Sequence, residues 1–241
     1  MACPIFRDLP GLSVSCSDTT VFLNSTGLPD HKFLNPQGLI VDQEFMLDFP
    51  LYPELNETKD YQDPCNFTTI FHLDNKPSED KYMSIAGFAL NGVPFFSPLS
   101  VDWVDPFYPP PGYEPENLDG CVAHTQVTGI YHYHMMPPCL FGDDENGETP
   151  LVKVGDAKTV ALDGFDPEDG LVTMGWAFDG FPVYGPYDDE GRFHTDLDNC
   201  NGKKDETGNY GYYSTLEFPY HIGCFGPGVM DGPPNKCSQE E

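Results

Sequence analysis

Basic residues are scarce in this sequence. Lys and Arg together number 11 against 39 Asp and Glu, so the formal net charge is −28. A surface of this charge repels phosphate backbones and anionic lipids, so we expect no nucleic-acid partner and no membrane partner. It suits cationic partners or calcium-rich fluid, and it would equally serve solubility alone. No apolar run approaches the roughly twenty residues that a membrane-spanning helix needs.

Several signatures of common enzyme and helical classes are also missing. The sequence has no phosphate-binding Gly-rich loop, no Gly-x-Ser-x-Gly nucleophile motif and no long apolar pattern with a 3.6-residue period. In their place stand 24 Gly and 25 Pro, which are typical of many turns between short strands.

The cysteines indicate an oxidising compartment. There are eight, with no CxxC pair, which predicts four disulfides. N-glycosylation sequons at Asn24, Asn56 and Asn66 point the same way, so we expect a secreted, extracellular glycoprotein. The N-terminal MACPIFRDLPG has no apolar signal-peptide segment, which fits a mature form with an added start Met. The cysteines are Cys3, Cys16, Cys65, Cys121, Cys139, Cys200, Cys224 and Cys237.

Two segments of the chain resemble each other. GFALNGVPFFSP (87–98) aligns with GWAFDGFPVYGP (175–186) at an offset of 88 residues. LDGC (118–121) aligns with LDNC (197–200) at an offset of 79, and in both copies a Tyr follows the Cys by ten residues. Two blocks in the same order, with a matching gap, predict an internal duplication.

The two units span 87–142 and 175–226 and differ mainly in their loops. The first carries an additional Pro-rich insert, DPFYPPPGYEPE (105–116), which we expect to be a surface loop. The repeat predicts one disulfide within each unit, Cys121–Cys139 in the first and Cys200–Cys224 in the second. The other four cysteines would pair in one of three ways.

Short aromatic and β-branched runs, several bounded by Asn-Gly or Asp-Gly turns, predict strands. We therefore expect an all-β, disulfide-stapled domain, a β-sandwich or barrel-like fold built from two quasi-equivalent repeat units. The duplicated domain is placed at 81–241, with an N-terminal β region at 1–80 packed on it. The runs are TTIFHL (68–73), SIAGFAL (84–90), GIYHYH (129–134), LVTMGWAF (171–178) and YGYYST (210–215).

The GIYHYH run indicates a candidate metal site. In a strand, His132 and His134 share one face with their imidazoles about 6–7 Å apart, while Tyr131 and Tyr133 share the other. His124, eight residues before His132, would lie on the neighbouring strand of a hairpin. Three imidazoles brought together in this way are a usual zinc or copper site. The alternative is three hydrogen-bonded core or surface histidines.

The second unit lacks all three histidines while keeping the Cys, Gly and Tyr framework. Histidines with a structural role would be expected in both units, because both units share one fold. The histidines of a metal site, in contrast, are kept or lost together. We therefore predict a metal site at His124, His132 and His134. The equivalents in the second unit are Lys203, Gly211 and Tyr213. The remaining histidines, expected to be structural with His72 and His221 as reserve ligands, are His31, His72, His194 and His221.

These motifs resemble those of the YHYH-domain proteins. The resemblance rests on GIYHYH, the preceding LDGC with its following His, GWAFDGFPVYGP, LDNCNG and FPYHIGCFG, and it covers about residues 84–228. Members of that family commonly carry a second His-bearing motif after LD-x-CNG. Here NGKK and GNYGYY stand in its place, so the resemblance implies one site, in the first unit. The family name supplies no reaction.

A three-His site leaves a coordination position open. Zn²⁺ there would lower the pKa of a bound water to about 7 and permit hydrolysis, while copper would permit O₂ or peroxide chemistry. The spacing does not choose between copper and zinc. Asp179 replaces Asn91 of the first unit and could orient a ligand His or act as a general base, or it could be a turn residue of its Asp-Gly pair.

Three functions fit these observations. The first is a secreted protein with one copper or zinc ion per chain, acting as an oxidoreductase or hydrolase on a small-molecule or O₂-type substrate. The second is a non-catalytic acidic extracellular matrix or calcium-dependent interaction protein, and the third is metal storage or scavenging. For the second, the calcium ligands would be the acidic loops DDENGE (143–148), DGFDPEDG (163–170) and YDDEG (187–191).

Overall fold

The structure is a computed structural model with all side chains. It describes residues 3–33, 39–55, 63–66, 84–141, 152, 154–230 and 236–239. The strand expected at 68–73, His72, the Asn56 sequon and the acidic loop at 143–148 lie outside the described residues.

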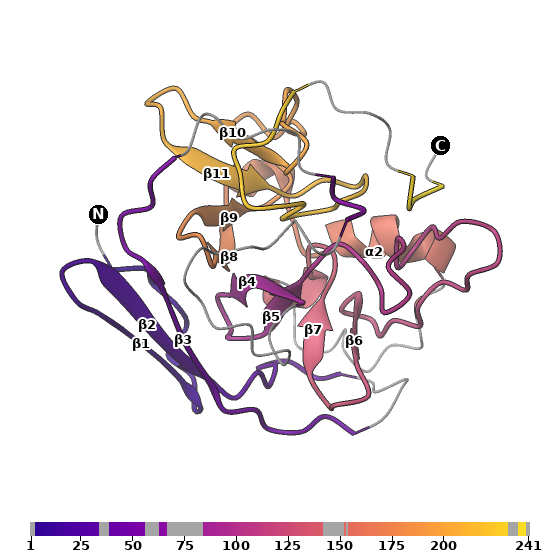
Figure 1. Cartoon of the computed structure of the whole chain (residues 1–241), viewed down its shortest axis with the longest axis horizontal. Helices are drawn as coiled ribbons and strands as arrows, with labels where there is room; N and C mark the ends of the chain where they lie inside the picture. The colour runs from indigo at the N-terminus through magenta and orange to yellow at the C-terminus, as the bar shows by residue number, and fades with distance from the viewer. Residues whose placement is uncertain are drawn as a thin grey trace.

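The N-terminal region forms a three-stranded antiparallel sheet (Figure 1). Strands β1 (Leu12–Cys16), β2 (Thr20–Ser25) and β3 (Phe45–Pro50) follow one another in space as in sequence. Alternate residues of β2 are buried, and Val21 and Leu23 belong to the same hydrophobic core as the larger sheet. The N-terminal sheet therefore packs on the rest of the protein. The expected boundary near residue 80 falls outside the described residues and stays a prediction.

The duplicated region forms an eight-stranded open sheet in the order β10-β11-β9-β8-β4-β5-β7-β6 (Figure 1). With the smaller sheet, it makes an all-β fold of the sandwich type, as expected, and it does not close into a barrel. The first unit contributes β4 (Ile85–Ala89), β5 (Pro94–Phe96), β6 (Ala123–Thr125) and β7 (Tyr131–Tyr133). The second contributes β8 (Thr173–Ala177), β9 (Pro182–Tyr184), β10 (Gly202–Lys204) and β11 (Tyr210–Tyr213).

The two units are related by an approximate two-fold axis between β4 and β8. These antiparallel strands pair Gly87 with Ala177 and Ala89 with Gly175, and an offset of 88 exchanges the two pairs. Each unit then repeats one order: an antiparallel hairpin, a parallel neighbour and a second antiparallel hairpin. The structure therefore confirms the two quasi-equivalent units.

The second hairpin of each unit contains the same network of side-chain hydrogen bonds. Asp119 accepts hydrogen bonds from the backbone N–H of Cys121 and Ala123 and from the hydroxyl of Tyr131. In the second unit Asp198 accepts from Cys200, Gly202 and Tyr210 in the same way. The LD-x-C motif is therefore a turn whose Asp links the start of each hairpin to a Tyr on the second strand of that hairpin.

Helical structure is short. The α-helix α2 (Ala157–Leu162) is accompanied by the 3₁₀ turns η2 (Pro138–Leu140), η4 (Val154–Asp156) and η5 (Pro167–Asp169). No helix within the described residues is long and apolar enough to cross a membrane.

All eight cysteines are paired. Cys121–Cys139 and Cys200–Cys224 form as the repeat predicted. Of the three pairings open to the other four, the structure has Cys3–Cys16 and Cys65–Cys237.

Candidate metal centre

The three predicted histidines meet on one face of the β6–β7 hairpin. The strands pair in the register His124 to His132, with a tight turn in which Gly129 has φ +82°. His134 follows the last residue of β7 and lies two positions beyond His132, so both rings point to the same side. One ligand nitrogen from each of the three lies within 4.8 Å of the others, and all three side chains are buried.

Backbone carbonyls fix the tautomer of two of the rings. The Nδ1–H of His132 donates to the carbonyl of Ile130 at 3.0 Å, and the Nδ1–H of His134 donates to the carbonyl of Ser97 at 2.8 Å. A carbonyl can only accept, so each neutral ring carries its lone pair on Nε2. These two Nε2 atoms face each other at 3.0 Å.

Aromatic side chains pack against the histidines. Phe96 stacks on His132 with ring centroids 3.8 Å apart, and its edge contacts His134 at 6.0 Å. The ring of Phe107 also packs edge-on against His134, with ring centroids 6.5 Å apart. The rings are therefore held in place by packing as well as by hydrogen bonds.

Glu116 adds a carboxylate that the sequence reasoning missed. Its Oε2 lies 2.7 Å from Nε2 of His124 and 3.6 Å from Nε2 of His134. The approach to His124 does not have hydrogen-bond geometry, and both atoms are buried without a hydrogen-bond partner in the described part of the chain. The one available signal was the position of Glu116 in the insert, which only the unit with the histidines possesses.

The expectation that this insert is a surface loop is wrong in part. Asp105 and Phe107 are fully buried, and the hydroxyl of Tyr220 donates to the carboxylate of Asp105 at 2.9 Å. The physical reason is that a buried Asp with a hydrogen-bond donor anchors the start of the insert in the core.

The electrostatics of the cluster favour neutral rings beside an anion. Burial, together with the charges of His124 and His134, lowers the pKa of His132 well below its ordinary value. Burial also lowers the pKa of His134 to about 4, against the raising effect of Glu116. Burial raises the pKa of Glu116, but the contact with His124 and the proximity of His134 outweigh that effect, so the pKa lies below its ordinary value.

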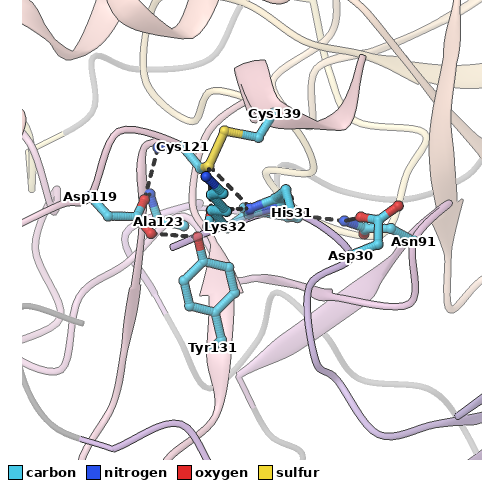
Figure 2. Close-up of a disulfide and its surroundings, with 10 residues drawn as sticks. Asp30, His31, Lys32, Asn91, Asp119, Cys121, Ala123, Tyr131 and Cys139 are labelled. Atoms are coloured by element: carbon cyan, nitrogen blue, oxygen red, sulfur yellow. Dashed lines mark hydrogen bonds between the residues drawn. A yellow bond between two sulfur atoms is a disulfide. The ribbon is translucent and has the colours of Figure 1, made fainter. Parts of the chain in front are cut away.

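The opposite face of the hairpin carries tyrosines and a disulfide, and Figure 2 shows Tyr131 with the Cys121–Cys139 bond. His31 donates from Nδ1 to the carbonyl of Lys32 and accepts from the hydroxyl of Tyr133, both at 2.8 Å. Its Nδ1 also lies 3.2 Å from Sγ of Cys121, which is bonded to Cys139 (Figure 2). Although His31 and these two sulfurs are close enough to share an ion, both sulfurs are used in the disulfide.

The other candidate residues lie apart from the three histidines. The hydroxyl of Tyr212 donates to Asp179, whose other carboxylate oxygen accepts from the N–H of Phe181 at 3.4 Å. These bonds are those of a turn residue, and a catalytic role for Asp179 stays a prediction. His221 packs against Phe95, with ring centroids 5.2 Å apart, and does not join the cluster.

A family model described as YHYH protein matches residues 71–191. This is half of the chain, and it includes the whole of the first unit with its three histidines. The chain belongs to the YHYH family. The match ends before the LDNCNG and FPYHIGCFG stretches, so the second hairpin of the second unit lies beyond the matched part of this YHYH protein. Neither a curated protein nor a solved structure matches the chain.

Proposed function

We propose that the protein binds one transition-metal ion through His124, His132 and His134. One observation supports the proposal above all: the Nε2 atoms of His132 and His134 lie 3.0 Å apart. Both rings donate Nδ1–H to a backbone carbonyl, so both Nε2 atoms carry a lone pair. Two lone pairs at this distance repel each other unless a cation lies between them. The two neutral imidazoles and the ionised Glu116 offer that cation a site with a net negative charge.

The distances fit a first-row metal. Ligand atoms at the corners of a tetrahedron with bonds of about 2.0–2.1 Å are roughly 3.3 Å apart. The three described separations among the four residues are 2.7, 3.0 and 3.6 Å, which bracket that value. The carbonyls of Ile130 and Ser97 act on the rings as second-sphere acceptors commonly do at metal sites, orienting each ring and raising its basicity.

A shared proton is the competing explanation of the short contact. One ring could be an imidazolium that donates Nε2–H to the other, with Glu116 as its counter-ion. Burial opposes this, because it lowers the pKa of both His132 and His134. Metal content distinguishes the two explanations.

The bound ion would supply either of two chemistries. Zinc would act as a Lewis acid and activate water, whereas copper would exchange electrons with O₂ or peroxide. Histidine and carboxylate ligands suit both divalent ions. Metal storage without turnover would use the same residues. The identity of the bound metal decides which of the two reactions to assay.

The calcium-dependent alternative has less support from the described residues. In the loop at 187–191 the Asp188 carboxylate accepts from Arg192 and from the N–H of Glu190, and in the loop at 163–170 Asp166 accepts from the N–H of Glu168. These carboxylates act in turns and an ion pair. Within the described ranges, the only groups of three or more candidate ligands are the two that contain His31 or His124.

The test is metal content on protein from a host that forms disulfides. We expect about one copper or zinc per native chain, and loss of that metal in His132→Ala/His134→Ala. His194→Gln, which changes a histidine of the second unit, serves as the matched control and should keep the metal. If the native protein contains no metal and takes up neither added copper nor added zinc, the proposal fails.

We also infer an extracellular location. Four disulfides persist in an oxidising compartment, and Asn24 of the first sequon is exposed on β2. Expression in a secreting eukaryotic host should give a glycan on Asn24 that is lost in Asn24→Gln. Mass spectrometry of the tryptic peptide checks this, and an unmodified Asn24 in secreted protein would contradict it.

A further inference from the structure

The insert of the first unit is positioned against the three histidines. The offset between the units falls from 88 before the insert to 79 after it, so the first unit is longer by 88 − 79 = 9 residues there. Both ends of the insert are tied down. Asp105 donates its N–H to the carbonyl of Cys237 at 2.8 Å, and Glu116 donates its N–H to the carbonyl of Pro106 at 2.8 Å. These backbone hydrogen bonds therefore fix the position from which the Glu116 side chain extends.

The side chain of Glu116 lies beside His124 and His134. Oε2 of Glu116 is 2.7 Å from Nε2 of His124 and 3.6 Å from Nε2 of His134, whose own Nε2 is 3.0 Å from that of His132. The side chain of His124 is 4% exposed, and neither of its ring nitrogens has a hydrogen-bond partner in the described residues. Buried polar atoms without a hydrogen bond are rare in proteins, and here three of them belong to the same cluster. They are the two ring nitrogens of His124 and Oε2 of Glu116, which lies 2.7 Å from Nε2 of His124.

We propose that Glu116 is the fourth ligand of this metal centre and closes it, an inference that rests on the proposed function. Three histidines alone leave a position open for water or substrate. With the carboxylate of Glu116 beside His124 and His134, the metal-loaded site would be four-coordinate. The duplication supports this assignment independently, because the second unit lacks the insert and all three histidines together.

Coordination by Glu116 would restrict the access of small ligands to the metal. The side chain of Glu116 is 13% exposed, against 4% for His124 and 3% for His134, so it is the most exposed of these three side chains, although its Oε2 is itself buried. Phe96 and Phe107 cover the histidines on other sides. A small anion or O₂ would then reach a bound metal by displacing the carboxylate, so Glu116 would control access to the site.

The experiment uses Co²⁺ as a spectroscopic probe and azide as the small ligand. Native protein, Glu116→Ala and Glu114→Gln are stripped of metal and titrated with Co²⁺, and the visible absorption bands of bound Co²⁺ are recorded. Each Co²⁺ form is then titrated with azide. Glu114→Gln is the matched control, because Glu114 lies on the same insert and is exposed.

We expect Glu116→Ala to bind Co²⁺ at least about 10–100-fold more weakly than native protein, because the loss of a group that only supports a ligand already costs this much at a metal site. Its absorption bands should shift, and it should bind azide at least about ten-fold more tightly, because the position is open. Glu114→Gln should match native protein in all three measurements.

Two results would overturn the inference, and they are distinguishable. If native protein and Glu116→Ala bind one Co²⁺ with the same bands and the same azide affinity, Glu116 is not a ligand but the three-His site stands. If native protein binds no Co²⁺ in competition with added chelator, the metal site itself fails and the inference with it.

Discussion

Single hydrogen bonds at the imidazole rings decide which ring nitrogens face the histidine cluster. The carbonyls of Ile130 and Ser97 hold His132 and His134 in the tautomer that turns both Nε2 lone pairs into the cluster. A glutamine at either position would keep polarity but lose this arrangement. The proposed metal binding therefore depends on the carbonyls that hold the two rings as well as on the histidines themselves.

His194 offers a test of burial at the residue scale, away from the metal site. It packs against Tyr213 with ring centroids 4.4 Å apart, and burial together with the charge of Lys203 lowers its pKa to about 4 from 6.5. The unfolded chain takes up the proton near pH 6.5 and the folded chain only near 4. The free energy of unfolding therefore falls as pH drops through this window and is unaffected by this group outside it.

We expect His194→Gln to remove about 1–2 kcal/mol of the stability loss between pH 7.5 and pH 4.5, a value reduced because the ring is partly exposed. Urea denaturation of native protein and variant at the two pH values measures this. Equal losses in the two proteins would show that the imidazole of His194 titrates normally.

At the residue scale, the duplication provided an internal comparison that singled out candidate residues. His124, His132 and His134 stood out because Lys203, Gly211 and Tyr213 replace them together. Glu116 has no counterpart in the second unit, so no comparison could single it out among 39 acidic residues. Its place in the cluster depends on how the insert folds back, which a Pro-rich sequence does not reveal.

At the scale of secondary-structure elements, the contact between β4 and β8 holds the two units together. Gly87 and Gly175 lie at equivalent positions, and a Cβ on Gly175 would lie 2.1 Å from the carbonyl oxygen of Phe88. A Cβ on Gly87 would lie 2.3 Å from the carbonyl oxygen of Trp176. Both contacts are with backbone, so a side chain there forces the central strands apart.

Gly175→Ala should therefore destabilise the protein by at least about 2 kcal/mol, as overpacking against backbone does. Gly155→Ala is the control, because a Cβ at Gly155 would meet nothing within 4 Å. Chemical denaturation gives both values. A Gly175→Ala variant as stable as Gly155→Ala would mean that the central pair is not packed as described.

The strands themselves were largely predictable. The runs at 84–90, 129–134, 171–178 and 210–215 contain β4, β7, β8 and β11. The hairpin that pairs His124 with His132 followed from the same reading. The order of the eight-stranded sheet did not, because the parallel pairs β5–β7 and β9–β11 join segments far apart in the chain.

At the scale of the whole molecule, Cys65–Cys237 joins the N-terminal region to the C-terminal residues across a separation of 172 residues. It also lies beside the insert, since the carbonyl of Cys237 accepts from the N–H of Asp105. The sequence left its pairing open among three possibilities, because spacing alone carries no information on which distant cysteines meet.

Closing a longer loop removes more entropy from the unfolded chain. We expect Cys65→Ser/Cys237→Ser to cost about 5 kcal/mol and Cys3→Ser/Cys16→Ser, with a separation of 13, about 3 kcal/mol. Thermal and denaturant unfolding of the two double variants compares them. A larger loss for the Cys3–Cys16 pair would contradict the chain-entropy argument for this fold.

The central claim is that one metal ion lies among His124, His132 and His134. Anomalous diffraction from crystals of metal-loaded protein, measured at the copper and zinc edges, tests it most directly. The account predicts one peak per chain, about 2.0–2.2 Å from a nitrogen of each histidine. An empty cluster in loaded crystals, or a peak only at the acidic loops, would contradict it.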